Sequence, residues 1–161
     1  MEENLYNIQE ISSYREGNRL EAKKAKGGIP NSMWETYSSF ANTDGGIILL
    51  GVDEKKDGSF EVLGVQNADQ MLKDFWNMVN NRQKINVNLL VEKNVTLEDY
   101  EGKKVISIRV PRADRYLRPV YVGQDPMSGS YRRNGEGDYH CSHEEVSAMY
   151  RDAYQLTQDR K

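Results

Sequence analysis

Cysteine is almost absent from this chain, which has one such residue, Cys141, among 161. A single cysteine excludes an internal disulfide and is typical of a reducing compartment. Long apolar runs are also missing, since the longest, at 47–50 with its neighbours, is far shorter than the roughly 20 residues that cross a bilayer. Residues 1–4 lack the basic and apolar regions of a secretory signal. We therefore expect a cytoplasmic globular protein with no membrane partner.

An excess of positive charge is missing too, because 22 lysines and arginines face 25 acidic residues and leave a net charge of −3. Bulk charge thus gives no support to nucleic-acid binding. Two local basic groups nevertheless stand out: Lys23, Lys24 and Lys26, and further along Arg112, Arg115, Arg118, Arg132 and Arg133. Arginine binds phosphates and the tyrosines interleaved between 109 and 139 stack on bases. The sequence leaves two alternatives, a phosphate-binding face or ordinary solvated charge with packed tyrosines.

The order of apolar and turn patterns predicts an α+β (α/β mixed) fold. We expect a mixed β-sheet of about six strands with three to four helices packed on it. No repeat or linker divides the chain, so residues 1–161 are expected to form one domain with its core at about 16–150. We expect this domain to be the N-terminal module of a longer protein. Helices are predicted at 5–13, from Ser32 to a stop at Asp44, at 68–82 and from Ser142 onward. Strands are predicted at 19–25, 47–53, 60–65, 88–95, 104–110, 119–122 and 130–133.

Three local signals support these boundaries. Ser32 and Ser142 are each followed three residues later by glutamate, the pattern of a capping box at a helix N-terminus. Asn67 is expected to cap the helix over 68–82. Glu101-Gly102 is expected to turn the chain between the strands over 88–95 and 104–110.

The most informative segment is Phe40-Ala41-Asn42-Thr43-Asp44-Gly45-Gly46, followed by Ile-Ile-Leu-Leu-Gly-Val and then Asp53. It predicts a helix end, a double-glycine turn and a strand buried on both faces, because its apolar run does not alternate with polar residues. Asp53 then emerges at the sheet edge, where sites are commonly built. The glycines do not form a phosphate loop, since they follow a helix and no Gly-Lys-Ser/Thr occurs. ATP hydrolysis by this chain is therefore excluded.

Two further sets of residues carry side chains that could support chemistry. His140, Cys141 and His143 lack the four spaced ligands of structural zinc, and nothing marks Cys141 as an activated nucleophile. Glu16, Glu21 and Asp53, with Lys23, converge if the strand over 19–25 pairs with 47–53. Carboxylates suit Mg²⁺ or Mn²⁺, which activate water against a phosphodiester. The alternative for this acidic set is a strand face of ordinary salt bridges.

With these residues in place, the chain resembles the Schlafen AlbA-like domain. Its pattern, Glu-x4-Glu-x-Lys followed by Phe-Ala-Asn-Thr-x-Gly-Gly and Gly-Val-Asp, is met by Glu16, Glu21 and Lys23, by 40–46 and by 51–53. Later matches are 62–65, 106–111, 118–121 and 131–135. The resemblance extends from about residue 16 to 149, and the segment 40–46 is its most specific part.

The resemblance implies two functions. Bacterial members are usually N-terminal modules of transcriptional regulators, which implies a module that binds DNA or RNA and needs no cofactor. Some vertebrate Schlafens cleave RNA with two glutamates and one aspartate. By position these are Glu16, Glu21 and Asp53, which implies the alternative of a nuclease that binds Mg²⁺ or Mn²⁺ there. A homodimer is also left open, and light scattering would test it.

Overall fold

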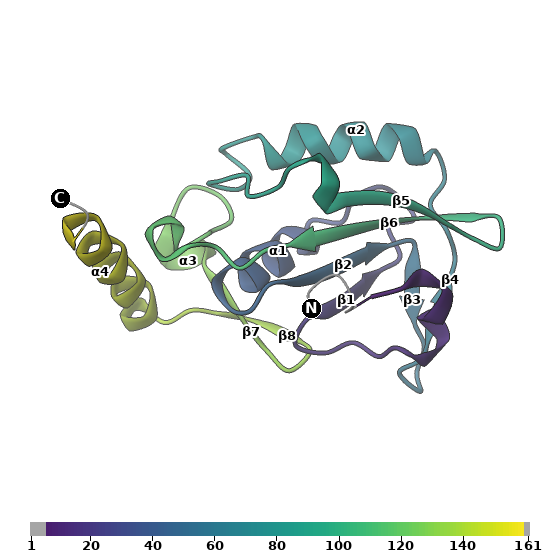
Figure 1. The fold of residues 1–161 in the computed structure, drawn as a ribbon, viewed down its shortest axis with the longest axis horizontal. Helices are drawn as coiled ribbons and strands as arrows, with labels where there is room; N and C mark the ends of the chain where they lie inside the picture. The colour runs from purple at the N-terminus through teal and green to yellow at the C-terminus, as the bar shows by residue number, and fades with distance from the viewer. Residues whose placement is uncertain (1–5, 160–161) are drawn as a thin grey trace.

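Four strands form the sheet on which the molecule is built (Figure 1). The computed structural model describes residues 6–159. Its main sheet has the order β1-β2-β6-β5, in which β1 runs parallel to β2 and the other pairs are antiparallel. The bounds are Leu20–Lys23 for β1, Gly46–Leu50 for β2, Val95–Tyr100 for β5 and Lys103–Val110 for β6. The α+β class and the mixed sheet are confirmed.

The other described strands pair as two separate hairpins. β3 (Val52–Glu54) pairs with β4 (Phe60–Val62), and β7 (Tyr131–Asn134) pairs with β8 (Gly137–His140). The apolar run predicted as one strand is divided at Gly51, whose φ of 102° favours glycine and redirects the chain. Asp53 therefore belongs to the β3–β4 hairpin and not to the main sheet.

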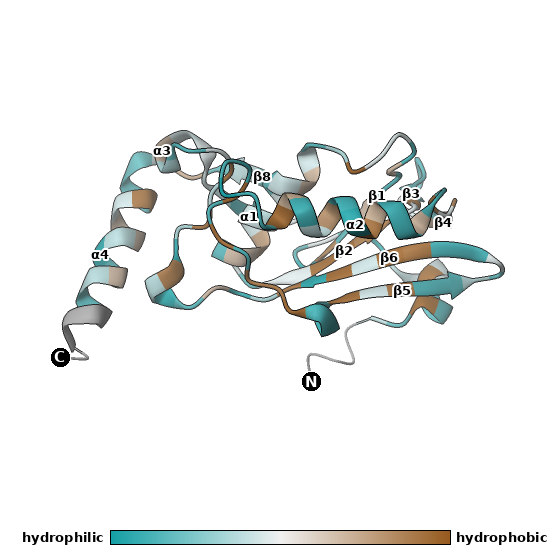
Figure 2. Cartoon of the chain, turned by 90° about the horizontal axis from the view of Figure 1, so that it is seen from above, coloured by the Kyte–Doolittle hydropathy of each residue, from teal (hydrophilic) through white to brown (hydrophobic). Residues whose placement is uncertain are grey.

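Both faces of the sheet are covered, which explains the continuous apolar character of β2. Ile48 and Leu50 face α1 (Ser32–Asn42) and α2 (Ala68–Val79) in one core. Ile47 and Leu49 face the short 3-10 helix η2 (Ile8–Ser13) and the β3–β4 hairpin in a second core. Figure 2 shows hydrophobic stretches along β2 and β6, whereas the outer end of the β5–β6 hairpin is hydrophilic. The predicted helix over 5–13 is thus this 3-10 segment, and its first residue lies outside the described residues.

Two of the three predicted caps are confirmed. Ser142 N donates to Glu145 Oε1 (2.7 Å) and Glu145 N donates to Ser142 Oγ (3.1 Å) before α4 (His143–Asp159). Asn67 caps α2 by accepting from Gln70 N at 3.4 Å. The capping box at Ser32 is wrong, because Ser32 already lies in the first turn of α1 and its hydroxyl accepts from Lys23 Nζ at 3.2 Å.

Two predicted strands do not form as strands, because side chains satisfy part of their backbone groups; of the residues 119–122, Tyr121 and Val122 form only isolated bridges, with Ser130 and Ile85. In the segment 88–94, which ends in the 3-10 helix η3 (Glu92–Asn94), Leu89 N donates to the Tyr37 hydroxyl, and that hydroxyl donates to Val87 O. Val120 is held in the same manner by the amide of Asn42, which both accepts from its N–H and donates to its carbonyl. The strand predicted at 88–95 is therefore wrong, and β5 begins at Val95.

The remaining described elements connect the sheet to α4. They are the 3-10 helix η4 (Arg115–Leu117) and α3 (Pro126–Gly129), and α4 projects away from the sheet beyond them (Figure 1). The turn at Glu101-Gly102 joins β5 to β6 as expected, with both residues at positive φ. Within residues 6–159, no helix combines the length and apolar composition that a bilayer crossing would need.

Candidate functional site

The first candidate site lies along β1, which is an edge strand of the main sheet. The predicted pairing of β1 with β2 is confirmed and sets Glu21 opposite Ile48. Glu16 precedes the tight turn into β1, and its Oε2 accepts from Ala22 N at 2.9 Å. Glu21 forms ion pairs through its two carboxylate oxygens, with Arg133 Nη2 at 2.8 Å and with Lys23 Nζ at 3.4 Å. Glu16 and Glu21 are therefore neighbours, as the sequence predicts, but Glu21 is already neutralised by internal partners.

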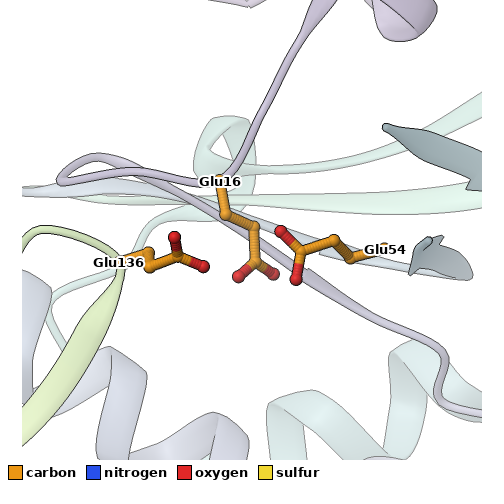
Figure 3. Close-up of side chains that lie close together, drawn as sticks. All are labelled: Glu16, Glu54 and Glu136. Carbon is orange, nitrogen blue, oxygen red and sulfur yellow. The ribbon is translucent and has the colours of Figure 1, made fainter. Parts of the chain in front are cut away.

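Three glutamates form a carboxylate cluster beside this edge (Figure 3). Glu16, Glu54 of β3 and Glu136 of the β7–β8 turn each offer a carboxylate oxygen, and these oxygens lie within 4.8 Å of one another. Burial, and then the charges of Glu21 and Glu54, raise the pKa of Glu16 to about 7. Burial and the nearby Glu136 also raise the pKa of Glu54. A set of hard oxygen donors fits Mg²⁺ or Mn²⁺.

Asp53 is not a member of this carboxylate cluster. It precedes Glu54 on β3, and successive side chains of a strand point to opposite faces. Its Oδ1 lies 3.9 Å from Lys24 Nζ. The cluster in the structure thus keeps one of the three residues assigned from the sequence, Glu16, and adds Glu54 and Glu136, which sequence reasoning missed.

The raised pKa of Glu16 predicts a pH effect on stability. Because the folded state holds this proton more tightly than the unfolded state, the stabilisation is full below pH 4.5 and is lost as pH rises through about 7. We therefore expect the stability of the wild type, relative to Glu16→Gln, to fall between these pH values. Urea unfolding at intervals across this range measures the difference, and Glu144→Gln, an exposed change on α4, is the control. A wild-type advantage that stays constant with pH would contradict this account of the cluster.

Arg133 is an internal residue and not an exposed phosphate ligand, which corrects the sequence assignment. Its side chain is fully buried, and its guanidinium bonds Glu21, Asp138 Oδ1 (2.8 Å) and the carbonyl of Gly17 (2.8 Å). It also lies 4.8 Å from the centre of the Phe40 ring. Arg133 therefore ties the β7–β8 hairpin to β1 and α1.

Lys23 and Arg112, which belong to the two basic groups, lie at opposite ends of β2, whereas Arg133 shares the carboxylate of Glu21 with Lys23. Lys23 pairs with Leu50 at the end of β2, whereas Val110, just before Arg112, pairs with Gly46 at its start. Lys23 is largely buried against Glu21 and Ser32, while Lys24 and Lys26 are exposed. Arg132 is half exposed and pairs with Glu145 at 3.3 Å, so it is engaged with α4.

The second candidate site is the end of the sheet where β1 starts and β6 ends. Arg19, Arg109 and Arg112 line a pocket of about 560 Å³ there. Arg115 and Arg118 follow on the same loop, and burial together with the charges of Arg112 and Arg115 lowers the pKa of Arg118. We call these residues the arginine-rich end: Arg19, Arg109, Arg112, Arg115 and Arg118.

Sequence reasoning placed three of these five arginines in the site and missed two. Arg19 stands alone in the sequence, and it joins the others because its carbonyl accepts from Ile47 N (2.9 Å) at the start of the parallel pairing. Arg109, Arg112, Arg115 and Arg118 recur every third residue, and this spacing is the signal that could have identified Arg109.

Comparisons with known proteins relate most of this architecture to one family. Residues 16–142 match the family described as Schlafen, AlbA_2. The N-terminal domain of a protein from Nitrosomonas europaea, described as related to the ATP-dependent DNA helicase RecG, was solved by NMR. It is 32% identical with a TM-score of 0.61, and the alignment covers 83% of this chain and 90% of that one.

The DIP2311 protein from Corynebacterium diphtheriae shares the fold at 18% identity and a TM-score of 0.59. That alignment covers 93% of this chain but 28% of the other. The comparison with curated proteins gives no match.

Proposed function

This chain belongs to the Schlafen AlbA_2 family, and from that membership we propose that it is a nucleic-acid-binding module. The arginine-rich end is the observation that carries this proposal. Arg112, Arg115 and Arg118 lie near one another on the segment after β6, beside Arg19 and Arg109, in a chain whose net charge is −3. Such a concentration matches the repeating negative charge of a phosphate backbone.

Phosphate contacts fix a protein on nucleic acid without reading its sequence. We propose accordingly that this domain supplies affinity and little base specificity. DNA is the first partner to test, because the similar domain from Nitrosomonas europaea belongs to a protein described as related to a DNA helicase. A place in a transcriptional regulator is the corresponding proposal for its biological role.

Fluorescence anisotropy with labelled DNA and RNA tests the binding proposal. We expect the logarithm of the association constant to fall linearly with the logarithm of salt concentration. If four or five phosphates are contacted, the slope is about −4 for duplex DNA. An association constant that does not change with salt concentration, or no binding to either nucleic acid, would overturn the proposal.

The carboxylate cluster supports a second candidate function, metal-dependent RNA cleavage. Glu16, Glu54 and Glu136 would hold Mg²⁺ or Mn²⁺, and such an ion polarises a phosphoryl oxygen and lowers the pKa of water. The prediction is Mn²⁺-dependent cleavage of structured RNA by the wild type and by Glu144→Gln, and none by Glu16→Gln. If all three proteins cleaved RNA equally, the activity would come from a contaminating nuclease and the second candidate function would be refuted.

A further inference from the structure

The outer face of the β7–β8 hairpin turns an aromatic side chain to solvent. Arg133 and Asp138 stand directly opposite each other and point inward, since Arg133 is buried and Asp138 accepts from the hydroxyl of Ser39 in α1. Side chains alternate along a strand, so the next opposite pair, Arg132 and Tyr139, points outward. Tyr139 keeps 51% of its surface exposed.

Gly137 and Arg132 determine how the Tyr139 ring lies on the hairpin. A Cβ at Gly137 would come within 2.8 Å of the Cε2 and hydroxyl oxygen of Tyr139, so the ring extends along the strand over a place that a side chain would fill. The guanidinium carbon of Arg132 lies over the ring at 5.8 Å from its centre, within the range of a cation–π contact. Glu145 holds this arginine through an ion pair of 3.3 Å. One face of the ring is therefore covered by a fixed guanidinium, and the exposed half is a flat apolar surface.

An exposed ring of this kind matches an unpaired nucleobase. Bases stack on aromatic side chains whatever their identity, because every base has a π-face, and a neighbouring arginine adds a cation–π contribution. In a duplex each base is already stacked between its neighbours, whereas in a single strand it can turn outward and stack on a protein ring. The chemistry of the hairpin surface thus selects a single strand.

Helix α4 connects this ring to the surface that we assign to phosphate binding. Glu145 in the first turn of α4 pairs with Arg132 of the hairpin, and the same helix packs against η4, which carries Arg115. The hairpin and the arginine-rich end are therefore neighbours across one helix. A single strand whose phosphates contact the segment 112–118 has the hairpin within its reach.

We propose that Tyr139, supported by Arg132, stacks on an unpaired base of a single-stranded nucleic acid. The inference rests on the proposed function and deepens it, because it names the form of nucleic acid that the domain prefers. The arginine-rich end contacts the phosphates of either form, and Tyr139 adds affinity only where a base is accessible.

Fluorescence anisotropy with three labelled DNA probes of equal length tests this inference: an oligothymidine single strand, a fully abasic single strand and a blunt duplex. The two single strands carry the same phosphates, so the ratio of their affinities at one salt concentration isolates the contribution of the bases. We expect the wild type to bind the oligothymidine about tenfold more tightly than the abasic strand, the gain of one stacked base.

Tyrosine variants assign this ratio to the hairpin. Tyr139→Ala is expected to bring the ratio to about one and to leave the affinity for the abasic strand and the duplex unchanged. Tyr139→Phe should keep the ratio, because stacking requires the ring and not the hydroxyl. Tyr154→Ala, the matched control, removes a tyrosine of α4 that is 66% exposed and should also keep the ratio.

Four results would overturn the inference. Equal, salt-dependent binding of both single strands by the wild type would leave the proposed function standing and refute the stacking. A ratio that survives in Tyr139→Ala would place the stacked base elsewhere. An equal loss of affinity for all three probes in Tyr139→Ala would show that the tyrosine does not act on bases. Absence of binding to every probe would refute this inference and the proposed function together.

Discussion

Replacement of both Arg112 and Arg115 by glutamine is expected to weaken binding of duplex DNA about a hundredfold at low salt. Both side chains are exposed on the loop after β6, and both belong to the arginine-rich end. Each phosphate contact that is lost removes one released counterion, so the salt slope should become shallower by about two. Anisotropy titrations at several salt concentrations give both quantities.

The matched control for this pair is the double variant Lys55→Gln, Lys56→Gln. Both lysines are exposed, and their substitution removes the same charge from the β3–β4 hairpin, away from the arginine-rich end. The control should bind with nearly the slope of the wild type. Equal losses in both double variants would mean that only net charge matters, and that the arginine-rich end is not the binding surface.

Substitution of Arg133 by methionine is expected to lower the free energy of unfolding by about 3–5 kcal/mol. Removal of one partner from a buried ion-pair network leaves the others charged and unpaired. Here Glu21 and Asp138 would both lose a 2.8 Å partner. For a domain of this size the midpoint of thermal unfolding should fall by roughly 10 °C.

The neighbouring residue supplies the control for Arg133. Arg132→Met removes an arginine of which 42% of the side chain is exposed and which pairs with Glu145 at the surface. Such a pair contributes at most about 1 kcal/mol. If the two variants were equally stable in urea, the internal role of Arg133 would be refuted.

Much of the fold follows from sequence patterns, and two of the exceptions share one cause. The unbroken apolar run before Asp53 predicted a buried strand, and the Ser-x-x-Glu pattern at Ser142 predicted the start of α4. The strand expected at 88–95 does not form, and the one expected at 119–122 is reduced to isolated bridges at Tyr121 and Val122, because Tyr37 and Asn42 bind the backbone of these segments. In both cases a polar side chain of α1 bonds a backbone group more than 50 residues away in the sequence and takes the place of a neighbouring strand. The local sequence of the bonded segment carries no sign of this contact.

The site was predictable only in part for the same reason. Glu16 and Glu21 were identified by their place beside a strand. Glu136 lies in a turn of the β7–β8 hairpin, whose second strand gave no pattern. Glu54 directly follows Asp53, and only the strand alternation places it on the face of the cluster. The burial of Arg133 could not be foreseen, since its carboxylate partner Glu21 lies 112 residues away.

The Phe-Ala-Asn-Thr-Asp-Gly-Gly segment has a structural role in this domain. Phe40 packs against Arg133, Asn42 holds residue 120 and the carbonyl of Tyr131, and Thr43 Oγ1 accepts from Arg133 N at 2.9 Å. The double glycine allows β2 to start against Phe40 and β6. The most specific part of the family pattern thus builds the framework that brings the arginines together.

An NMR titration of the ¹⁵N-labelled domain with a short DNA duplex tests the central claim most directly. The account predicts chemical-shift changes at residues 44–47 and 109–118, the backbone of the arginine-rich end, that diminish as salt is added. Changes confined to residues 23–26 and 54–58, at the opposite end of the sheet, would contradict it.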